Sequence, residues 1–178
     1  MLKTTFKKTL LSVLLGSLFL LQTSVCSAKS VHDLKAAYLY NFIKFISWPD
    51  APSTDIEIKL CLLGEDASNE KLKRLEQRLI HGHPLLIKSI NQYNDATECT
   101  VLFIGSSEEK FLNEIFTALG NKPTLTVSSI PHFATQGGTI GFVTMGNVIR
   151  FDINLKKATK TQLSISSKLL ELANQVVR

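Results

Sequence analysis

The sequence predicts a single α/β domain in which helices cover both faces of a mixed β-sheet, with a C-terminal β-hairpin followed by a helix. Three observations support this prediction. Short apolar runs typical of buried strands alternate with longer segments of helical periodicity. A Gly146-Asn147 pair separates the last two strand-like runs, which is the turn signal of a hairpin. The 178 residues and 44% apolar content are enough for one hydrophobic core.

The N-terminal segment has the pattern of a secretory signal peptide. Three lysines and no acidic residue surround the start of the apolar run Leu10–Leu21, which as a helix would span roughly 18 Å. That is shorter than the ~30 Å hydrocarbon core of a membrane. The small residues Cys26 and Ala28 then predict cleavage after Ala28. The alternative is a lipoprotein acylated at Cys26, which the bulky Val25 before it disfavours.

The net charge of +5 belongs largely to this segment. Removing residues 1–28 leaves a domain, residues 29–178, with 17 Lys and Arg against 15 Asp and Glu, a net charge of +2. No cluster of basic side chains with interleaved aromatics remains that would follow a phosphate backbone. We therefore expect no nucleic-acid binding, and the signal peptide predicts that the domain is exported.

The segment Leu34–Ser47 is predicted as the first helix of the domain. Ser30 and Asp33 have the spacing of a capping box before it. Its apolar stripe is broad, which predicts packing on more than one surface, and Lys35 is the charged residue that does not fall on the polar side. Pro49 and Pro52 are expected to end the helix.

Four strand-like runs and two helical segments follow. The predicted strands are Ile56–Leu63, His83–Ile90, Cys99–Ile104 and Leu125–Ser128. The third is almost wholly apolar, which predicts a central place in the sheet. The predicted helices are Asn69–Leu79 and Glu108–Leu119. The second of these is expected to bury Phe111, Ile115, Phe116 and Leu119 and to end at Gly120.

The C-terminal part is predicted to be the hairpin and a last helix. Thr139–Thr144 and Val148–Ile153 flank the Gly-Asn turn and have the composition of its two strands. Leu163–Val177 has helical periodicity and is expected to form the helix that follows. Its buried side chains are predicted to be Leu169, Leu170, Ala173, Val176 and Val177.

Cys61 and Cys99 are the two cysteines of the predicted domain. Paired cysteines in an exported chain favour a disulfide, and a bridge that closes about 39 residues would stabilise the fold by roughly 4 kcal/mol. Two buried free thiols are the alternative, because the sequence does not show whether the Cα atoms approach within the ~7 Å limit. No Cys-x-x-Cys motif is present, so a catalytic redox role is not expected.

The sequence contains no recognisable catalytic or cofactor motif. A nucleophile elbow, a P-loop, a dinucleotide fingerprint and a His-Glu-x-x-His motif are all absent. His81-Gly82-His83 offers two metal ligands without a third nearby, so no metal site is expected. We therefore expect neither enzyme activity nor a cofactor. A hydrolase that uses Ser128 or His132 is the weakest alternative.

His132 and the Gly137-Gly138 pair lie in a loop that leads into the hairpin. The histidine offers a polar contact, and the two glycines would let the backbone approach an anion. These three residues are therefore candidate ligand-binding positions, the alternative being an ordinary loop before a strand. They belong to a second functional hypothesis, in which the protein is the small-molecule-binding component of a periplasmic sensor system.

Five of the 14 aromatic residues lie within eleven positions at the end of the first helix. Phe42 and Phe45 fall on the apolar stripe and are expected in the core. Tyr40 falls opposite that stripe and Trp48 follows the helix, so both are candidates for a partner or dimer surface, where aromatic residues act as anchors. Arg150 in the hairpin is a third candidate, against the alternative of a solvated or intradomain side chain.

Four stretches of the chain resemble the YfiR-like family of periplasmic proteins. Their order and spacing match that family across essentially all of residues 29–178. The stretches are KAAYLYNFIKFISWP (35–49), TLTVSSIPHFATQGGTIGFV (124–143), VIRFDINL (148–155) and ISSKLLELA (165–173).

This resemblance implies a negative regulator that is exported to the periplasm and acts through protein–protein contact. It implies binding to the periplasmic domain of an inner-membrane diguanylate cyclase, which keeps cyclic di-GMP synthesis low. An outer-membrane peptidoglycan-binding lipoprotein is implied as the partner that sequesters the regulator, and a homodimer is expected. Cys61 and Cys99 match the position of one family disulfide. The second family bridge has no counterpart here, because the predicted domain has no further cysteine.

Overall fold

A computed structural model describes residues 30–49, 57–67, 70–146 and 148–178. The predicted signal peptide with Cys26 lies outside these residues. The helices are α2 (Val31–Lys44), α3 (Glu70–Lys73), α4 (Leu112–Leu119), α5 (Leu155–Lys160) and α6 (Ser167–Leu172). Short 3-10 helices occur at η2 (Glu65–Ala67), η3 (Tyr93–Glu98) and η4 (Ser106–Phe111). Within the described ranges, no helix has the length and apolar character needed to cross a membrane.

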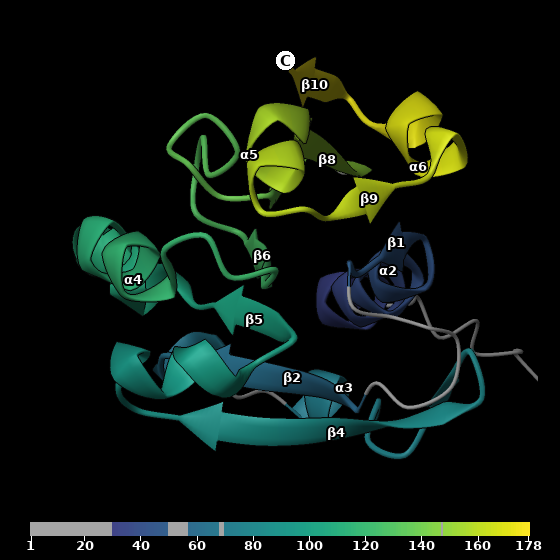
Figure 1. Cartoon of the computed structure of the whole chain (residues 1–178). Coiled ribbons are helices and arrows are strands. Elements are labelled where there is room, and N and C mark those ends of the chain that lie inside the picture. Colours follow the sequence, from purple (N-terminus) through teal and green to yellow (C-terminus); the bar gives the residue numbers. More distant parts are fainter. Residues whose placement is uncertain (1–29, 50–56, 68–69, 147) are drawn as a thin grey trace, which may run out of the picture.

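An eight-stranded mixed sheet forms the centre of the domain (Figure 1). Its strands are β2 (Ile58–Leu63), β3 (Leu79–Ile80), β4 (His83–Ile90), β5 (Val101–Ile104), β6 (Leu125–Ser128), β7 (Ile140–Met145), β8 (Val148–Asn154) and β10 (Gln175–Val177). They are ordered β10-β8-β7-β6-β5-β2-β4-β3. The five strands from β4 to β7 are parallel, whereas β7 pairs antiparallel with β8 and β4 pairs antiparallel with β3. The predicted fold class is confirmed, and β5 lies inside the sheet as expected.

Helices cover both faces of the sheet because neighbouring residues of each buried strand point in opposite directions. In β2, Leu60 and Leu62 join the hydrophobic cluster that includes α2, whereas Cys61 and Leu63 join the cluster that includes α4. Figure 1 shows α2 and α4 on opposite sides of the strands β2 and β5. A strand buried on both faces is apolar at every position, which explains the continuous apolar run in the sequence.

Helix α2 has the predicted capping box, but it begins three residues before the predicted Leu34, at Val31, and it ends earlier than expected. The Asp33 N–H donates to Ser30 Oγ over 3.2 Å, and the Ser30 N–H donates to Asp33 Oδ2 over 3.3 Å. The helix stops at Lys44 because the next residues form β1 (Ile46–Ser47), which pairs antiparallel with β9 (Ser164–Ile165). The predicted end at Ser47 is therefore wrong: strand pairing ends the helix before the chain reaches Pro49, and Pro52 lies outside the described residues.

An aromatic cluster joins α2 to the hairpin. The fully buried ring of Phe42 lies 5.5 Å from that of Phe142 and 4.8 Å from that of Phe151, measured between centroids. Tyr38 lies beside the same three rings. Phe42 is in the core as predicted. Phe45 is not, because it follows the last helical residue and is 36% exposed.

The predicted helix Asn69–Leu79 is mostly wrong. Only Glu70–Lys73 is α-helical. The chain then turns to form a pair with β4, in which the Gln77 N–H donates to the Leu85 carbonyl and the Leu85 N–H donates to the Arg78 carbonyl. These long-range hydrogen bonds compete with those of a helix. The spacing of the leucines in this segment is compatible with either structure.

The predicted helix Glu108–Leu119 differs from the structure in its first turn. Residues up to Phe111 form the 3-10 helix η4, and α4 begins at Leu112. Because a 3-10 helix has three residues per turn, this turn changes which side chains face inward. Leu112 is buried with Ile115, whereas Phe111 is 39% exposed, so the prediction that Phe111 is buried is wrong.

The C-terminal segment is a hairpin followed by helical structure, as predicted. The one long helix that was predicted there does not form. Two short helices, α5 and α6, are separated by β9, and the chain ends in β10, which pairs in parallel with β8. Leu169 is buried as expected and Leu170 and Ala173 pack against the core. Val176 and Val177 belong to β10, so their apolar character serves a strand instead of a helix.

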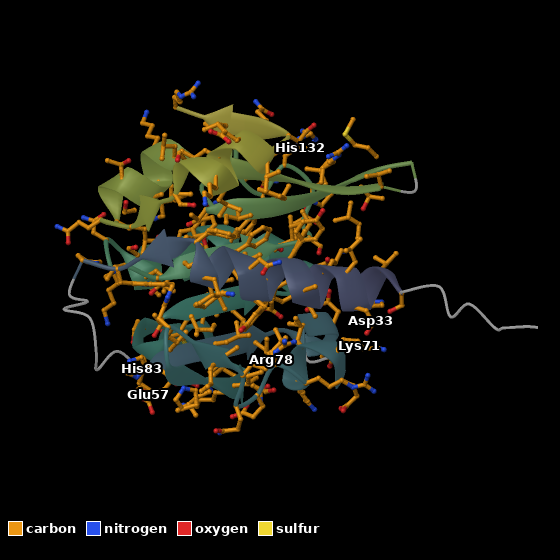
Figure 2. All side chains as sticks on the ribbon, turned by 90° about the vertical axis from the view of Figure 1, so that its right-hand side faces the viewer. Asp33, Glu57, Lys71, Arg78, His83 and His132 are labelled. Atoms are coloured by element: carbon orange, nitrogen blue, oxygen red, sulfur yellow. A yellow bond between two sulfur atoms is a disulfide. The ribbon has the colours of Figure 1, made fainter. Side chains whose placement is uncertain are left out.

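An ion pair fastens the start of α2 to α3. Lys71 Nζ lies 2.7 Å from Asp33 Oδ1, and Figure 2 shows the two side chains together near the first turn of α2. Hydrogen bonds from Lys71 and then Ser30 lower the pKa of Asp33 from 3.8 to about 2. A carboxylate whose pKa is lower in the folded than in the unfolded chain stabilises the fold above its unfolded value and loses that effect as the pH falls through its folded value.

Replacing Asp33 with asparagine is therefore expected to destabilise the protein at pH 7 and progressively less between pH 4 and pH 2. Denaturant unfolding of the wild type and Asp33→Asn at several pH values measures this difference. Glu70→Gln is the matched control, because Glu70 pairs with Lys73 at 3.4 Å in a largely exposed position, where ion pairs contribute little. A gap between wild type and Asp33→Asn that stays constant down to pH 2 would contradict the prediction.

Candidate functional site

The order of the strands creates a switch point between β2 and β5. In the sheet, β2 lies between β4 and β5. The chain runs from β2 to β4 on one side of β2, and then crosses to β5 on its other side. The segment after β2 packs its Ala67 and Leu72 into the cluster with α2, whereas the segment after β5 packs Leu112 into the cluster with α4. The two connections thus leave toward opposite faces. Such a divergence opens a crevice at the carboxyl ends of the two strands. In open α/β sheets, ligands bind in this crevice.

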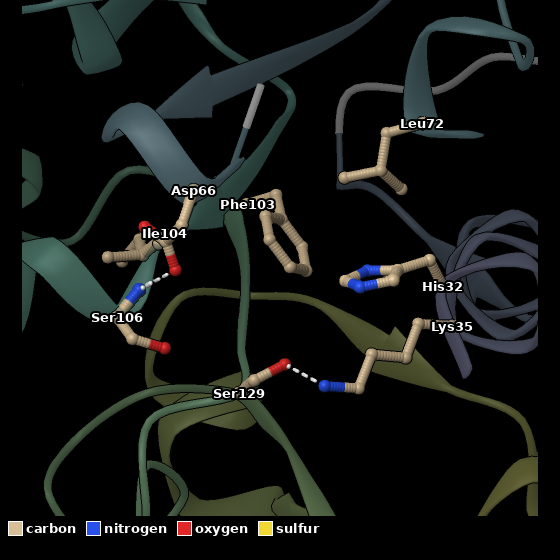
Figure 3. A pocket seen from close by; sticks show the side chains of 9 residues that line it. His32, Lys35, Asp66, Leu72, Phe103, Ile104, Ser106 and Ser129 are labelled. Atoms are coloured by element: carbon tan, nitrogen blue, oxygen red, sulfur yellow. Dashed lines mark hydrogen bonds between the residues drawn. The ribbon is translucent and has the colours of Figure 1, made fainter. Parts of the chain in front are cut away.

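A cavity of about 220 Å³ with both polar and apolar walls lies at this switch point (Figure 3). Its walls come from the first turns of α2, the loops after β2, β5 and β6, and α3. The lining residues are His32, Lys35, Asp66, Leu72, Phe103, Ile104, Gly105, Ser106 and Ser129. Residues 97 positions apart in the sequence therefore meet at one site.

Asp66 is held in place by the loop after β5. Its carboxylate accepts hydrogen bonds from the Ser106 N–H at 2.7 Å, from the Ser107 N–H at 3.3 Å and from the Ser107 hydroxyl at 3.0 Å. Partial burial opposes the charge, but these hydrogen bonds outweigh it and keep the pKa of Asp66 below its ordinary value. The cavity therefore has one fixed negative charge on the side of β2 and β5.

Two glycines allow the loop after β2 and the loop after β5 to lie in close contact. A Cβ on Gly105 would overlap Asp66 Oδ1, and one on Gly64 would lie 2.6 Å from Ser107 Oγ. Gly64 also has a φ of +96°, a conformation that L side chains rarely adopt. Sequence reasoning missed this pair, although each glycine directly follows an apolar strand-like run.

Lys35 supplies the opposite charge from α2. Its Nζ donates to Ser129 Oγ at 2.8 Å and lies 5.7 Å from the centroid of Phe142. Among the residues that the structure describes, Lys35 forms no ion pair. Burial lowers the pKa of Lys35, against the opposing effect of the Asp66 charge. The signal that could have found this residue is its place off the polar side of an amphipathic helix.

The cavity places a serine hydroxyl next to a lysine. A serine next to a lysine can act as a nucleophile with its base, but acyl transfer also needs N–H groups that are free to stabilise an oxyanion. The N–H groups of Ser106 and Ser107 already donate to Asp66, and that of Ile130 donates to Ser128 Oγ. These three N–H groups are therefore not available to stabilise an oxyanion.

Cys61 and Cys99 form a disulfide, which excludes the free-thiol alternative. Their Cα atoms are 5.8 Å apart, within the range that a disulfide spans. Cys61 lies in β2 on the α4 side of the sheet, and Cys99 follows η3 at the entrance to β5. The bridge joins these two neighbouring segments of the sheet away from the cavity.

The aromatic candidates lie toward the opposite end of the sheet from the cavity. The Tyr40 hydroxyl donates to the Leu79 carbonyl at 2.7 Å, and the Arg78 guanidinium lies 4.6 Å from the Tyr40 ring. Trp48 is partly buried beside a second cavity of about 330 Å³, where Cys99 also lies. Within the described part of the chain, the Trp48 indole N–H has no hydrogen-bond partner. A role of Tyr40 or Trp48 in partner binding stays a prediction.

Arg150 lies on a part of the hairpin that extends beyond the rest of the sheet. It is exposed and pairs with Val143, whereas β7 contacts the neighbouring β6 only through Ile140 and Gly141. Nearer the turn, Met145 and Val148 are 55% and 51% exposed. Because β7 runs parallel to β6, this extension lies at the same end of the sheet as the cavity. The structure thus separates Arg150 from Tyr40 and Trp48.

The loop residues His132, Gly137 and Gly138 do not line the switch-point cavity. The exposed His132 has a φ of +58°, and its carbonyl accepts hydrogen bonds within the turn that it forms. Gly137 has a φ of +107°, and a Cβ on Gly138 would overlap the ring of Phe133. Backbone conformation and packing thus account for both glycines, and their role in ligand binding stays a prediction.

Ser128 is buried and its hydroxyl is already bonded on both sides. It donates to the Ile104 carbonyl at 2.7 Å and accepts from the Ile130 N–H at 3.0 Å. These bonds fasten the end of β6 to β5 and leave the oxygen unsuited to nucleophilic attack. The described residues also contain no group of three or more His, Cys, Asp or Glu side chains that could hold a metal ion.

Comparison with known proteins gives one family and a related fold. The family described as YfiR/HmsC-like matches residues 32–174. A crystal structure of a conserved domain protein from Vibrio cholerae O1 biovar El Tor is similar with a TM-score of 0.55 at 10% sequence identity. The match covers 83% of this chain and 60% of that one, so this chain spans less than two thirds of its length. At this identity, the likeness concerns the fold alone.

Proposed function

This chain belongs to the YfiR/HmsC-like family, and we propose that it is an exported periplasmic regulator that represses a membrane-bound diguanylate cyclase by protein–protein binding. The family match over residues 32–174 is the observation that supports this function most strongly. The signal-peptide pattern supports the compartment. So does the Cys61–Cys99 bridge, because disulfides persist in oxidising compartments such as the periplasm.

The proposed mechanism is a shift in the population of the cyclase's conformations. The regulator binds the periplasmic domain of the cyclase more tightly in an inactive conformation than in an active one. By linkage, this difference in affinity is the free energy by which binding shifts the cyclase toward its inactive conformation. The cyclase itself carries the change across the membrane. An outer-membrane peptidoglycan-binding lipoprotein would relieve repression by competing for the regulator, which we propose acts as a homodimer.

Deletion of the gene is the direct test of this function. We expect cellular cyclic di-GMP to rise in the deletion strain and to return to its original level when the gene is restored. A second deletion, of the target cyclase, should abolish the rise. Unchanged cyclic di-GMP after deletion, in cells that express the protein and the cyclase, would refute the proposed function.

Arg150 is the candidate contact residue with the best support. Its side chain is exposed on the projecting part of the hairpin, beside two exposed apolar side chains, and an arginine among apolar groups is a common composition for an interface anchor. We expect Arg150→Glu to weaken binding to the periplasmic domain of the cyclase by about tenfold or more, which titration calorimetry measures.

Arg74→Glu provides the matched control for this experiment. Arg74 is also exposed but follows α3, away from the hairpin, so the same change of charge should leave the affinity unaltered. Equal affinities of the wild type and Arg150→Glu would remove Arg150 from the contact surface. The deletion experiment tests the function itself independently of this surface.

A further inference from the structure

We propose that the switch-point cavity binds a small organic carboxylate with an apolar body, and that Lys35 anchors the carboxylate group. The proposal goes beyond the regulatory function and does not depend on it. It rests on the residues that line the cavity, on their charges, and on the place of the cavity at the carboxyl ends of β2, β5 and β6.

The first step is the charge of Lys35, which forms no ion pair with any residue that the structure describes. A partly buried ammonium group loses hydration, and proteins usually compensate for this with a carboxylate in contact. Here the hydrogen-bond partner is the neutral hydroxyl of Ser129, at 2.8 Å. An ammonium group has three N–H donors, so the bond to Ser129 leaves donors for an anion. The cavity beside Lys35 is where such an anion would be bound.

The second step is the set of donors around Lys35. His32 lies three residues earlier on α2, so both side chains project from the same side of the helix toward Phe103 and Ser129 (Figure 3). The hydroxyl of Ser106 lines the cavity as well. An ammonium, an imidazole and two hydroxyl groups on converging walls match the acceptor oxygens of a carboxylate.

The third step selects the class of anion. Asp66 carries a fixed negative charge on the wall opposite α2, and a second negative charge on the ligand would be repelled by it. With Lys35 as its cation and Asp66 as its anion, the cavity thus favours a monocarboxylate, which has one negative charge, over phosphate esters, which have up to two. Leu72 and the ring of Phe103 provide an apolar wall, and a volume of about 220 Å³ limits the ligand to a small molecule.

Binding of benzoate to the purified protein tests this proposal. Amide chemical shifts of Ser106 and Ser129, followed by NMR during titration, report on the cavity directly. Benzoate is expected to shift them saturably. Benzyl alcohol, which has the same ring without the charge, and inorganic phosphate, which has charge without the ring, are expected to bind at least tenfold more weakly.

Two lysine variants separate the cavity from the general effect of charge. Lys35→Met is expected to raise the Kd for benzoate at least tenfold, and Lys44→Met, at the exposed end of the same helix, is expected to leave it unchanged. The wild-type fold of each variant is checked by its amide spectrum. If Lys35→Met fails to fold, Lys35→Gln and Ser129→Ala replace it, because each removes one partner of the same hydrogen bond.

The proposal is overturned if benzoate causes no saturable shift at Ser106 and Ser129, or if the lysine variants bind it equally well. If phosphate binds as tightly as benzoate, the cavity is a general anion site and the proposed preference for a carboxylate is wrong. None of these measurements involves the cyclase, so their failure leaves the regulatory function untouched. Failure of the deletion experiment likewise leaves the cavity proposal standing.

Discussion

Replacing Cys61 and Cys99 together with alanine is expected to lower the free energy of unfolding by roughly 4 kcal/mol, because the bridge closes a loop of about 39 residues in the unfolded chain. The two residues are separated by 38 positions, and both are buried against the α4 side of the sheet. For a domain of this size, the loss corresponds to a fall in Tm of about 10 °C. Denaturant and thermal unfolding of the purified oxidised protein measure both quantities.

The wild-type protein under reducing conditions is the matched control for this variant. Reduction breaks the same bond without removing the sulfur atoms, so it should reproduce most of the loss, while the double variant should be insensitive to the reductant. The remaining difference between the two reports the loss of buried sulfur from the core. A double variant within about 1 kcal/mol of the oxidised wild type would show that the bridge contributes little.

Replacing Phe42 with alanine is expected to destabilise the protein by about 3–5 kcal/mol. Phe42 is fully buried, and its ring packs against those of Phe142 and Phe151 from the two strands of the hairpin. Its removal takes away buried apolar surface and leaves a cavity between α2 and the sheet. Because these elements are far apart in the sequence, the remaining side chains cannot close that cavity without moving the helix.

Phe111→Ala makes the same chemical change at an exposed position. Phe111 is 39% exposed on the surface turn before α4, so its removal is expected to cost less than about 1 kcal/mol. Denaturant unfolding of the two variants compares them directly. Equal losses would contradict the assignment of the aromatic cluster to the core, and an insoluble Phe42→Ala variant is replaced by Phe42→Leu, with a smaller expected loss of the same sign.

Local patterns in the sequence predicted most of the sheet. Six strands, β2, β4, β5, β6, β7 and β8, begin and end within two residues of their predicted positions. For β2, β5 and β6 this succeeded because a strand buried on both faces is an apolar run whatever its neighbours are. The start of α2 was equally predictable, since the capping box of Ser30 and Asp33 is a local interaction.

Predictions failed where distant segments compete for the same backbone. Pairing of β1 with β9 ends α2 at Lys44, and pairing with β4 replaces most of the helix predicted after Asn69. The valines at the C-terminus are in β10 because β8 offers a free edge for pairing. In each case the apolar pattern was compatible with both a helix and a strand, and contacts far along the chain decided between them.

The candidate site depended on the same long-range order. Lys35 and Ser129 are 94 residues apart and Asp66 and Ser106 are 40 apart, so no spacing in the sequence joins them. Sequence reasoning noticed Lys35 only as an exception on its helix. It directed attention instead to His132 and its neighbouring glycines, where chain turns and close packing account for the residues.

The sequence by itself determined the single α/β domain, the strands of its sheet, the cap of α2, the export signal as a prediction and the resemblance to one family. Each of these depends on composition or on neighbours along the chain. The tertiary structure decided the ends of the helices, the pairing of Cys61 with Cys99 and the meeting of Lys35, Asp66 and Ser129 at the switch point. These depend on strand order and register, which only the packing of distant segments establishes.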